Sequence, residues 1–123
     1  MKEVRVDDAP SPIGPYSQAI VHGDLVFCSG QLGLDPSTGK LKEGAVEQTR
    51  QALTNLEAVL RGAGSSLHHA LKVTVYLTDL SCFPQMNEVY ADFFVPPYPA
   101  RTAIQVSALP KGAMVEIDVI AER

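Results

Sequence analysis

The sequence has only two cysteines, Cys28 and Cys82, among its 123 residues. Both stand in apolar contexts, so we expect buried free thiols in a reducing compartment rather than a disulfide framework. No apolar run approaches the ~20 residues that a membrane-spanning helix needs, and the N-terminal residues lack the apolar segment of a secretory signal. The sequence therefore predicts a cytoplasmic protein without a membrane segment.

Basic residues are also few, since 10 Lys and Arg stand against 14 Asp and Glu and give a net charge of -4. This balance argues against a nucleic-acid-binding surface. The chain has no phosphate-cradling Gly-rich loop and no dinucleotide fingerprint. Its histidines, His22 and the adjacent His68 and His69, do not cluster as metal ligands would. We expect neither a cofactor nor a metal.

The length predicts a single domain, residues 1–123. Periodicity predicts strands at residues 2–6, 17–22, 24–29, 70–78, 101–108 and 115–119, and helices at residues 45–61 and 82–94. Residues 17–29 form a hairpin around Gly23, and its second strand is apolar on both faces, as in a central strand. This order predicts an α+β fold in which two helices cover one face of a mixed sheet. The other face, with polar and small residues, is either solvated or packed against another subunit.

Two alternating patterns near the C-terminus contain the most informative pair, Arg101 and Glu116. Each belongs to the polar set of its strand. If the turn at residues 109–112 closes a hairpin, the apolar sets share one face, because a one-residue slip would expose one of them. We then expect Arg101 and Glu116 on one polar surface, where Arg can grip a carboxylate and Glu can transfer a proton. An ordinary ion pair on a solvated face is the alternative.

Four further residues are candidates for a site. Gly30, after Ser29 at the end of a buried strand, would let the backbone approach a ligand and offer N–H groups to an oxyanion; a plain turn glycine is the alternative. Tyr16 follows a stiff Pro-rich loop and either enters a site or packs beside the prolines. Asn87 interrupts the second helix and either serves a site or faces solvent. Ser29 has no identifiable His and Asp partners, so we do not interpret it as a nucleophile.

Together these fragments resemble the reactive intermediate deaminase family, the RidA or YjgF type. No single motif is specific, but their order and spacing cover nearly the whole chain. The matching segments are residues 13–19 (IGPYSQA), 29–31 (SGQ), 87–90 (NEVY), 99–103 (PARTA), 109–112 (LPKG) and 115–117 (VEI).

The resemblance implies a chorismate-mutase-like fold and a homotrimer with sites between subunits. The implied reaction is cofactor-free hydrolysis of 2-imino acids, formed from enamines such as 2-aminoacrylate, to 2-oxo acids and ammonia. Arg101 matches the arginine that pairs with the substrate carboxylate, and Glu116 matches the glutamate that positions or activates water. Other pocket positions are matched by Tyr16, Ser29, Gly30, Asn87 and Ala103. Ala103 stands where many members have Cys, and its main-chain carbonyl would hold the imine nitrogen.

Two other functions stay open at this point. One is a trimeric protein that binds 2-oxo acids in a regulatory role without turnover, and the other is an RNA-cleaving or chaperone-like role. The acidic charge argues against RNA. The presence of both Arg101 and Glu116 favours the enzyme over the regulatory protein.

Overall fold

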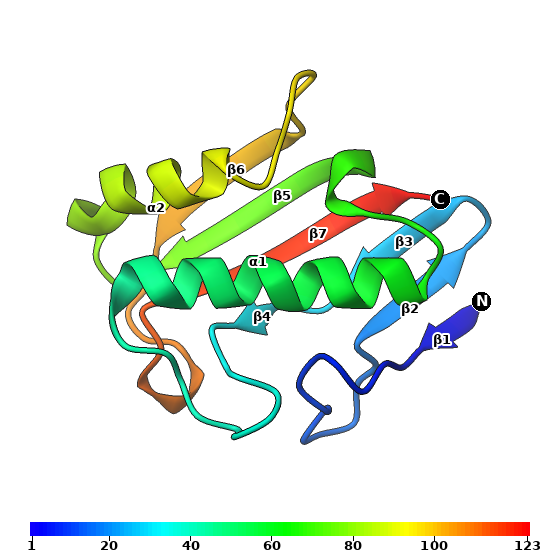
Figure 1. Cartoon of the computed structure of the whole chain (residues 1–123), viewed down its shortest axis with the longest axis horizontal. Coiled ribbons are helices and arrows are strands. Elements are labelled where there is room, and N and C mark those ends of the chain that lie inside the picture. Colours follow the sequence, from blue (N-terminus) through cyan, green and yellow to red (C-terminus); the bar gives the residue numbers. More distant parts are fainter.

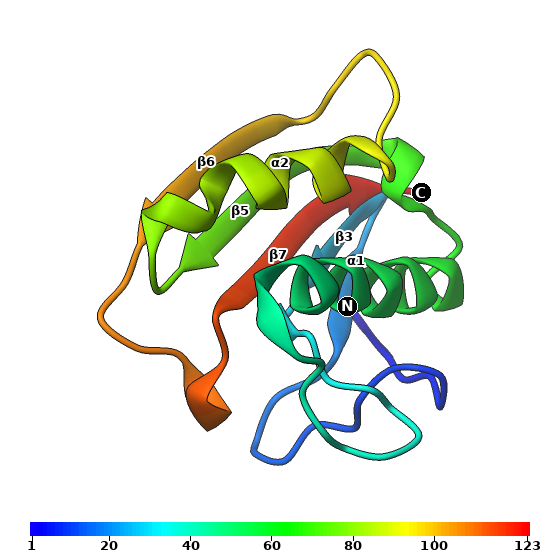
Figure 2. The same cartoon turned by 60° about the vertical axis from the view of Figure 1, so that its left-hand side comes forward.

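Two helices lie on one face of a single mixed sheet in the computed structural model, which describes residues 1–123 (Figures 1 and 2). The elements are β1 (Lys2–Val4), β2 (Ala19–His22), β3 (Leu25–Cys28), β4 (Gln31–Leu32), α1 (Gly44–Gly62), β5 (Ala70–Leu77), α2 (Phe83–Ala91), β6 (Ala100–Gln105) and β7 (Val115–Glu122). The strand order is β1-β2-β3-β7-β5-β6, and β4 also pairs with β7. The predicted α+β arrangement is confirmed. Neither helix is long and apolar enough to cross a membrane.

The hydrophobic core lies between the helices and the sheet. From α1 it takes a fully buried stripe that includes Leu53, Leu56 and Leu60, as the periodicity predicts. Gly64, with φ +81°, follows the end of α1, and its N–H donates to the Arg61 carbonyl. A left-handed residue of this kind is the usual way to end a helix, and glycine adopts it without strain.

The hairpin of β2 and β3 is also confirmed, with His22 opposite Leu25 and a φ of +59° at Gly23. As predicted, β3 is central, between β2 and β7. Its apolar character on both faces has an unexpected consequence, because Leu25 and Phe27 lie on the helix-free face and are 37% and 42% exposed. The helix-free face is therefore more apolar than the sequence indicated.

The predicted C-terminal hairpin is wrong. β5 lies between β6 and β7, pairing parallel with β6 and antiparallel with β7. The connection at residues 106–114 therefore crosses the end of β5 instead of joining neighbouring strands. β5, α2 and β6 form a parallel crossover, and the helix supplies the length that such a connection needs (Figure 2).

This topology puts Arg101 and Glu116 on opposite faces of the sheet. Arg101 pairs with Val73, which is buried under the helices, so Arg101 faces the helix side. Glu116 pairs with Tyr76, which alternates with the buried Val75, so Glu116 faces the helix-free side. The expectation of one shared polar surface is therefore wrong. It assumed that the two strands pair with each other, whereas each of them pairs with β5, and its register with β5 decides which face its side chains take.

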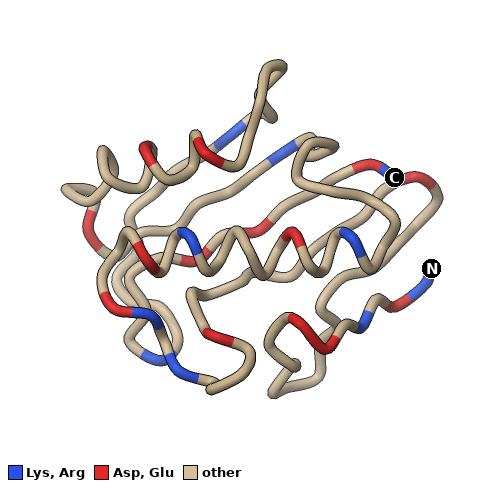
Figure 3. Tube along the Cα trace, in the orientation of Figure 1, with Lys and Arg blue, Asp and Glu red and all other residues tan.

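Charged residues of both signs are interspersed along the chain (Figure 3). The ion pairs join Lys42 to Asp35, Arg50 to Glu47 and Asp92, and Arg61 to Glu57. Arg101 and Glu116 belong to none of them, so the ordinary ion pair considered for these two residues is absent within one chain.

The two cysteines are free thiols, as predicted, but both are partly buried rather than fully buried. Burial, with a smaller contribution from the charge of Asp118, raises the pKa of Cys28 to about 12. This thiol therefore stays protonated at neutral pH and is a poor nucleophile.

Candidate functional site

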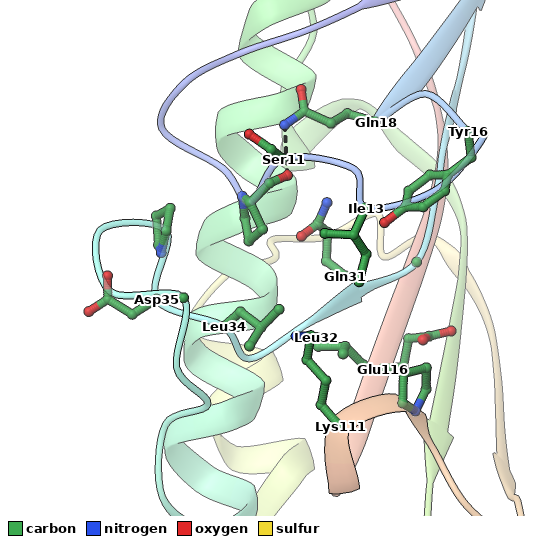
Figure 4. Close-up of a pocket in the computed structure, with 15 residues that line it drawn as sticks. Ser11, Ile13, Tyr16, Gln18, Gln31, Leu32, Leu34, Asp35, Lys111 and Glu116 are labelled. Atoms are coloured by element: carbon green, nitrogen blue, oxygen red, sulfur yellow. Dashed lines mark hydrogen bonds between the residues drawn. The ribbon is translucent and has the colours of Figure 1, made fainter.

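Glu116 lies in a cavity of about 450 Å³, which we call the Glu116 cavity. Figure 4 shows Ile13 and Tyr16 at its upper side and Lys111 at its lower side, with Gln31 between them. Gly30 also lines this cavity. The structure thus brings together three of the predicted site residues, Tyr16, Gly30 and Glu116.

The loop that holds Tyr16 is anchored by two polar side chains. Gln18 is buried; its Oε1 accepts from the Val6 N–H at 2.7 Å, and its Nε2 donates to the Pro10 carbonyl at 2.9 Å. Ser29 donates its hydroxyl to the Ser17 carbonyl at 2.6 Å. The Ser29 hydroxyl thus fixes the chain next to Tyr16, which itself is half-exposed. Tyr16 therefore lines a cavity rather than being packed away beside the prolines.

Gly30 and Glu116 are in close contact. A Cβ at position 30 would lie 2.7 Å from Oε2 of Glu116 and 2.8 Å from its carboxyl carbon. Gly30 does not have a positive φ, so the requirement for glycine here is one of space rather than backbone conformation. The absence of a side chain at Gly30 lets the carboxylate lie directly against the main chain.

Burial, and next the negative charge of Asp118, raise the pKa of Glu116 above its ordinary value. Asp118 lies two residues along the same face of β7 and accepts a hydrogen bond from the Tyr76 hydroxyl at 3.1 Å. A carboxyl group with a raised pKa exchanges protons closer to neutral pH than an ordinary glutamate does. The environment of Glu116 is therefore suited to proton transfer.

Arg101 lines a second cavity, of about 470 Å³, which we call the Arg101 cavity. It opens between α2 and the start of β6, and its lining consists of Asn87, Tyr90, Ala91, Tyr98, Pro99 and Arg101. Ala103, two residues along β6 from Arg101, faces the same side and packs against the core. Arg101, Asn87 and Ala103 are thus grouped on one side of the sheet.

The Arg101 guanidinium is held by side chains of α2. Nη1 donates to Oδ1 of Asn87 at 2.7 Å. The guanidinium carbon lies 4.7 Å from the ring centre of Tyr90 and 5.3 Å from that of Phe83, which is within the range of a cation–π interaction. Asn87 therefore faces Arg101, and the solvent-facing alternative does not hold.

The structure divides the predicted site residues into two groups that do not meet within one chain. It also adds residues that sequence reasoning missed, namely Gln31 and Lys111 in the Glu116 cavity and Phe83, Tyr90 and Tyr98 around Arg101. Lys111 has the only positive φ outside glycine, 61°. Bulky residues rarely adopt this conformation, and those that do are concentrated at functional sites. Nothing in the sequence indicates that Lys111 adopts it. Tyr90 entered the sequence analysis only within the matching segment 87–90, and Phe83 was not singled out.

Comparison with known proteins decides the family. Residues 6–123 match the family described as Endoribonuclease L-PSP. A RutC family protein of Pyrococcus horikoshii is 52% identical over 98% of both chains. The 2-iminobutanoate/2-iminopropanoate deaminase of Bos taurus is 46% identical over 98% of this chain and 88% of its own. This chain belongs to the RidA/YjgF family.

Solved structures of the RidA/YjgF family have the same fold. RidA from the Antarctic bacterium Psychrobacter sp. PAMC 21119 gives a TM-score of 0.98 at 46% identity, over 100% of both chains. Escherichia coli TdcF, solved with bound serine, gives a TM-score of 0.95 at 39% identity, over 100% of this chain and 99% of its own. The resemblance seen in the sequence motifs is thus confirmed over the whole chain.

Proposed function

We propose that this chain is a 2-imino acid deaminase of the 2-iminobutanoate/2-iminopropanoate type, which hydrolyses enamine-derived imines to 2-oxo acids and ammonia. Mammalian relatives with this name support the activity. The observation that carries the proposal is the placement of Arg101 and Glu116 in separate cavities on opposite sheet faces. Neither cavity holds both groups that the reaction needs, so the proposed site forms between two copies of the chain.

The proposed assembly is a homotrimer. A closed ring uses heterologous contacts, in which one patch meets a different patch on the next copy. The Glu116 cavity of one copy and the Arg101 cavity of its neighbour are a pair of this kind. The helix-free face supports association, because Leu25, Phe27 and Ile104 are all large, apolar and at least 37% exposed there.

In the proposed reaction, Arg101 binds the carboxylate of the imino acid through its planar fork. Glu116 takes a proton from water while the water oxygen bonds to C2 and the C=N π electrons move to nitrogen. A proton then passes to nitrogen, the C–N bond breaks, and ammonia leaves as the carbonyl forms. One iminium ion and one water thus give one 2-oxo acid and one ammonium ion. The iminium carbon is already electrophilic, so orientation and proton transfer carry the catalysis.

The remaining site residues divide between the two sides of the proposed interface. Tyr16 and the main chain at Gly30 enclose the reacting centre from the Glu116 side. Ser29 holds the chain beside Tyr16 through its hydrogen bond to the Ser17 carbonyl. Asn87 acts from the Arg101 side, and the Ala103 carbonyl would hold the imine nitrogen. The serine bound to TdcF is a compact α-amino acid with the same carboxylate, which supports this substrate class.

A protein that only binds 2-oxo acids would need Arg101 but not Glu116. The raised pKa of Glu116 favours an enzyme, because a simple carboxylate receptor gains nothing from a second, partly buried acid beside the ligand. The net charge of -4 argues against the nuclease activity in the family description.

Mixing two inactive variants tests this proposal. Arg101→Ala and Glu116→Gln are each expected to lose ammonia release from an enamine generated in situ, measured above the spontaneous rate. In randomly mixed trimers, about a quarter of the interfaces combine an intact Arg101 cavity with an intact Glu116 cavity. Co-refolded variants should therefore recover about a quarter of wild-type activity if the trimer is a three-fold ring.

Two controls make the result decisive. Each variant refolded alone should stay inactive, and light scattering should give about three times the chain mass of 13.2 kDa. Mixed trimers without any recovery would refute a site shared between copies. A wild-type protein that binds 2-oxobutyrate without releasing ammonia would instead favour the regulatory role.

A further inference from the structure

The Arg101 guanidinium is contacted by three side chains from a single stripe of α2. Phe83, Asn87 and Tyr90 are spaced i, i+4 and i+7, so they lie on one helix face. Two helical turns, about 10.5 Å along the axis, separate Phe83 from Tyr90. The guanidinium carbon lies 5.3 Å and 4.7 Å from the two ring centres, about half of that length from each. We call these three side chains the α2 cradle.

Each ring of the α2 cradle is itself held in place. Tyr90 is only 7% exposed, and its ring stacks on Phe94 with a centroid separation of 4.3 Å and an interplanar angle of 27°. Phe83 is the first residue of α2 and packs against the core. The cation thus rests against surfaces that cannot move freely, and an arginine held in this way loses less freedom when it binds a ligand.

The Tyr90 hydroxyl is buried without a hydrogen-bond partner. Burial raises the pKa of Tyr90, although the positive charge of Arg101 opposes this shift. The side chain is therefore a neutral phenol, and it contributes to Arg101 through its ring rather than through a phenolate charge. Within one chain, the contact that Tyr90 makes with Arg101 is therefore a contact of its ring.

Asn87 completes the α2 cradle by accepting from a single guanidinium nitrogen, Nη1. The guanidinium has five N–H donors, so this bond fixes its rotation while most donors stay free for a ligand. Arg101 is itself exposed toward the Arg101 cavity. The arrangement presents a held fork with one donor bound to α2 and the others available to a ligand.

We propose that Phe83 and Tyr90 are positioning residues, which hold the Arg101 guanidinium ready for a substrate carboxylate before the substrate arrives. This inference rests on the proposed function, since it takes Arg101 as the carboxylate-binding group. It also gives Asn87 a role that acts through Arg101. Removing a ring should therefore weaken carboxylate binding, because the guanidinium loses a surface that holds it in place.

The test combines ligand affinity with a direct measurement on Arg101 in the full-length protein. Calorimetry gives the affinity for 2-oxobutyrate, and NMR gives the hydrogen exchange of the Arg101 Nε–H. Tyr90→Leu keeps an apolar side chain but removes the ring, and we expect about tenfold weaker binding and faster Nε–H exchange. Tyr90→Phe keeps the ring, and its affinity should stay within about twofold of wild type.

Met86→Ala is the structural control, because Met86 lies in α2 but is buried in the core. It should lower the unfolding temperature while leaving affinity and Nε–H exchange near wild type. If Tyr90→Leu does not fold, Phe83→Leu at the partly exposed start of the helix gives the same readouts.

The outcomes separate this inference from the proposed function. Unchanged affinity and exchange in folded Tyr90→Leu and Phe83→Leu would overturn the inference. Equal losses in Tyr90→Phe and Tyr90→Leu would also overturn it, by assigning the effect to the hydroxyl. Slow exchange that is lost in Tyr90→Leu would support the α2 cradle even if wild type did not bind 2-oxobutyrate, in which case only the proposed function would fail.

Discussion

Replacing Gly30 with alanine tests the placement of Glu116 more finely than removing the carboxylate does. The new Cβ would lie 2.7 Å from Oε2 of Glu116, whereas heavy atoms in ordinary contact are at least ~3.5 Å apart. The carboxylate must therefore withdraw by roughly an ångström from its position. A displacement of this size at a catalytic group is enough to lower the rate about 10²-fold.

The fold should tolerate this change. The displaced atoms belong to the end of a flexible side chain, and Gly30 has no positive φ that an alanine would strain. We expect the free energy of unfolding to change by no more than about 0.5–1 kcal/mol. Gly30→Ala should thus release ammonia from an in situ enamine about 10²-fold more slowly, with an unfolding temperature close to wild type.

Gly33→Ala is the matched control, with the same substitution three residues along the chain. Its Cβ would lie 2.4 Å from Cα of Gln48, in the backbone of α1. A helix backbone cannot withdraw as a carboxylate can, so this variant should lose at least about 1–3 kcal/mol of stability. A wild-type rate in Gly30→Ala, or equal destabilisation of the two variants, would refute the reasoning.

Three other substitutions test separate features. Burial and Asp118 raise the pKa of Glu116, so the folded protein loses stability as pH rises through that pKa and the carboxyl group becomes charged. Glu116→Gln stays neutral, so it should unfold at a higher temperature than wild type at pH 8 but not at pH 4. An equal difference at both pH values would contradict this. Arg101→Lys keeps the charge but loses the fork, so calorimetry should show about 10–150-fold weaker 2-oxobutyrate binding in a folded protein, and near-native affinity would count against the fork. Phe27→Asp places a charge on the helix-free face, so light scattering should show dissociation toward one chain, whereas an intact trimer would exclude this face from the interface.

Local features of the fold could be predicted from the sequence because short-range physics determines them. The turn at Gly23 could be predicted because glycine readily adopts the positive φ that the turn has. Helix α1 could be predicted from the spacing of Leu53, Leu56 and Leu60. β4 escaped prediction because two residues, Gln31 and Leu32, are too few to show an alternation.

Strand order could not be predicted in the same way. Alternation shows which residues of β6 share a face, but it does not show which strand lies beside β6. The order of β5, α2 and β6 contains the missing information, because a strand–helix–strand unit favours a parallel crossover. With that interpretation, Arg101 would have been placed beside Val73 and therefore on the helix side.

The sequence proposed candidate site residues, but it did not give their arrangement. Arg101, Glu116, Tyr16 and Gly30 all line cavities. No sequence pattern, however, distinguishes an aromatic side chain of a helix that only packs in the core from one that also contacts a guanidinium. Phe83 and Tyr90 have the same spacing in either case. Only the position of Arg101 over that stripe shows the difference.

The separation of Arg101 from Glu116 also has a chemical reason within the proposed function. An arginine beside the glutamate in the same chain would lower the pKa of that carboxyl group and would occupy the fork with an internal ion pair. In this fold, Glu116 instead has only the negative Asp118 and partial burial as influences, and its pKa is raised. Arg101 has only a neutral amide and two rings as partners. Within one chain, neither group is therefore tied up in an ion pair, as the proposed reaction between two copies would require.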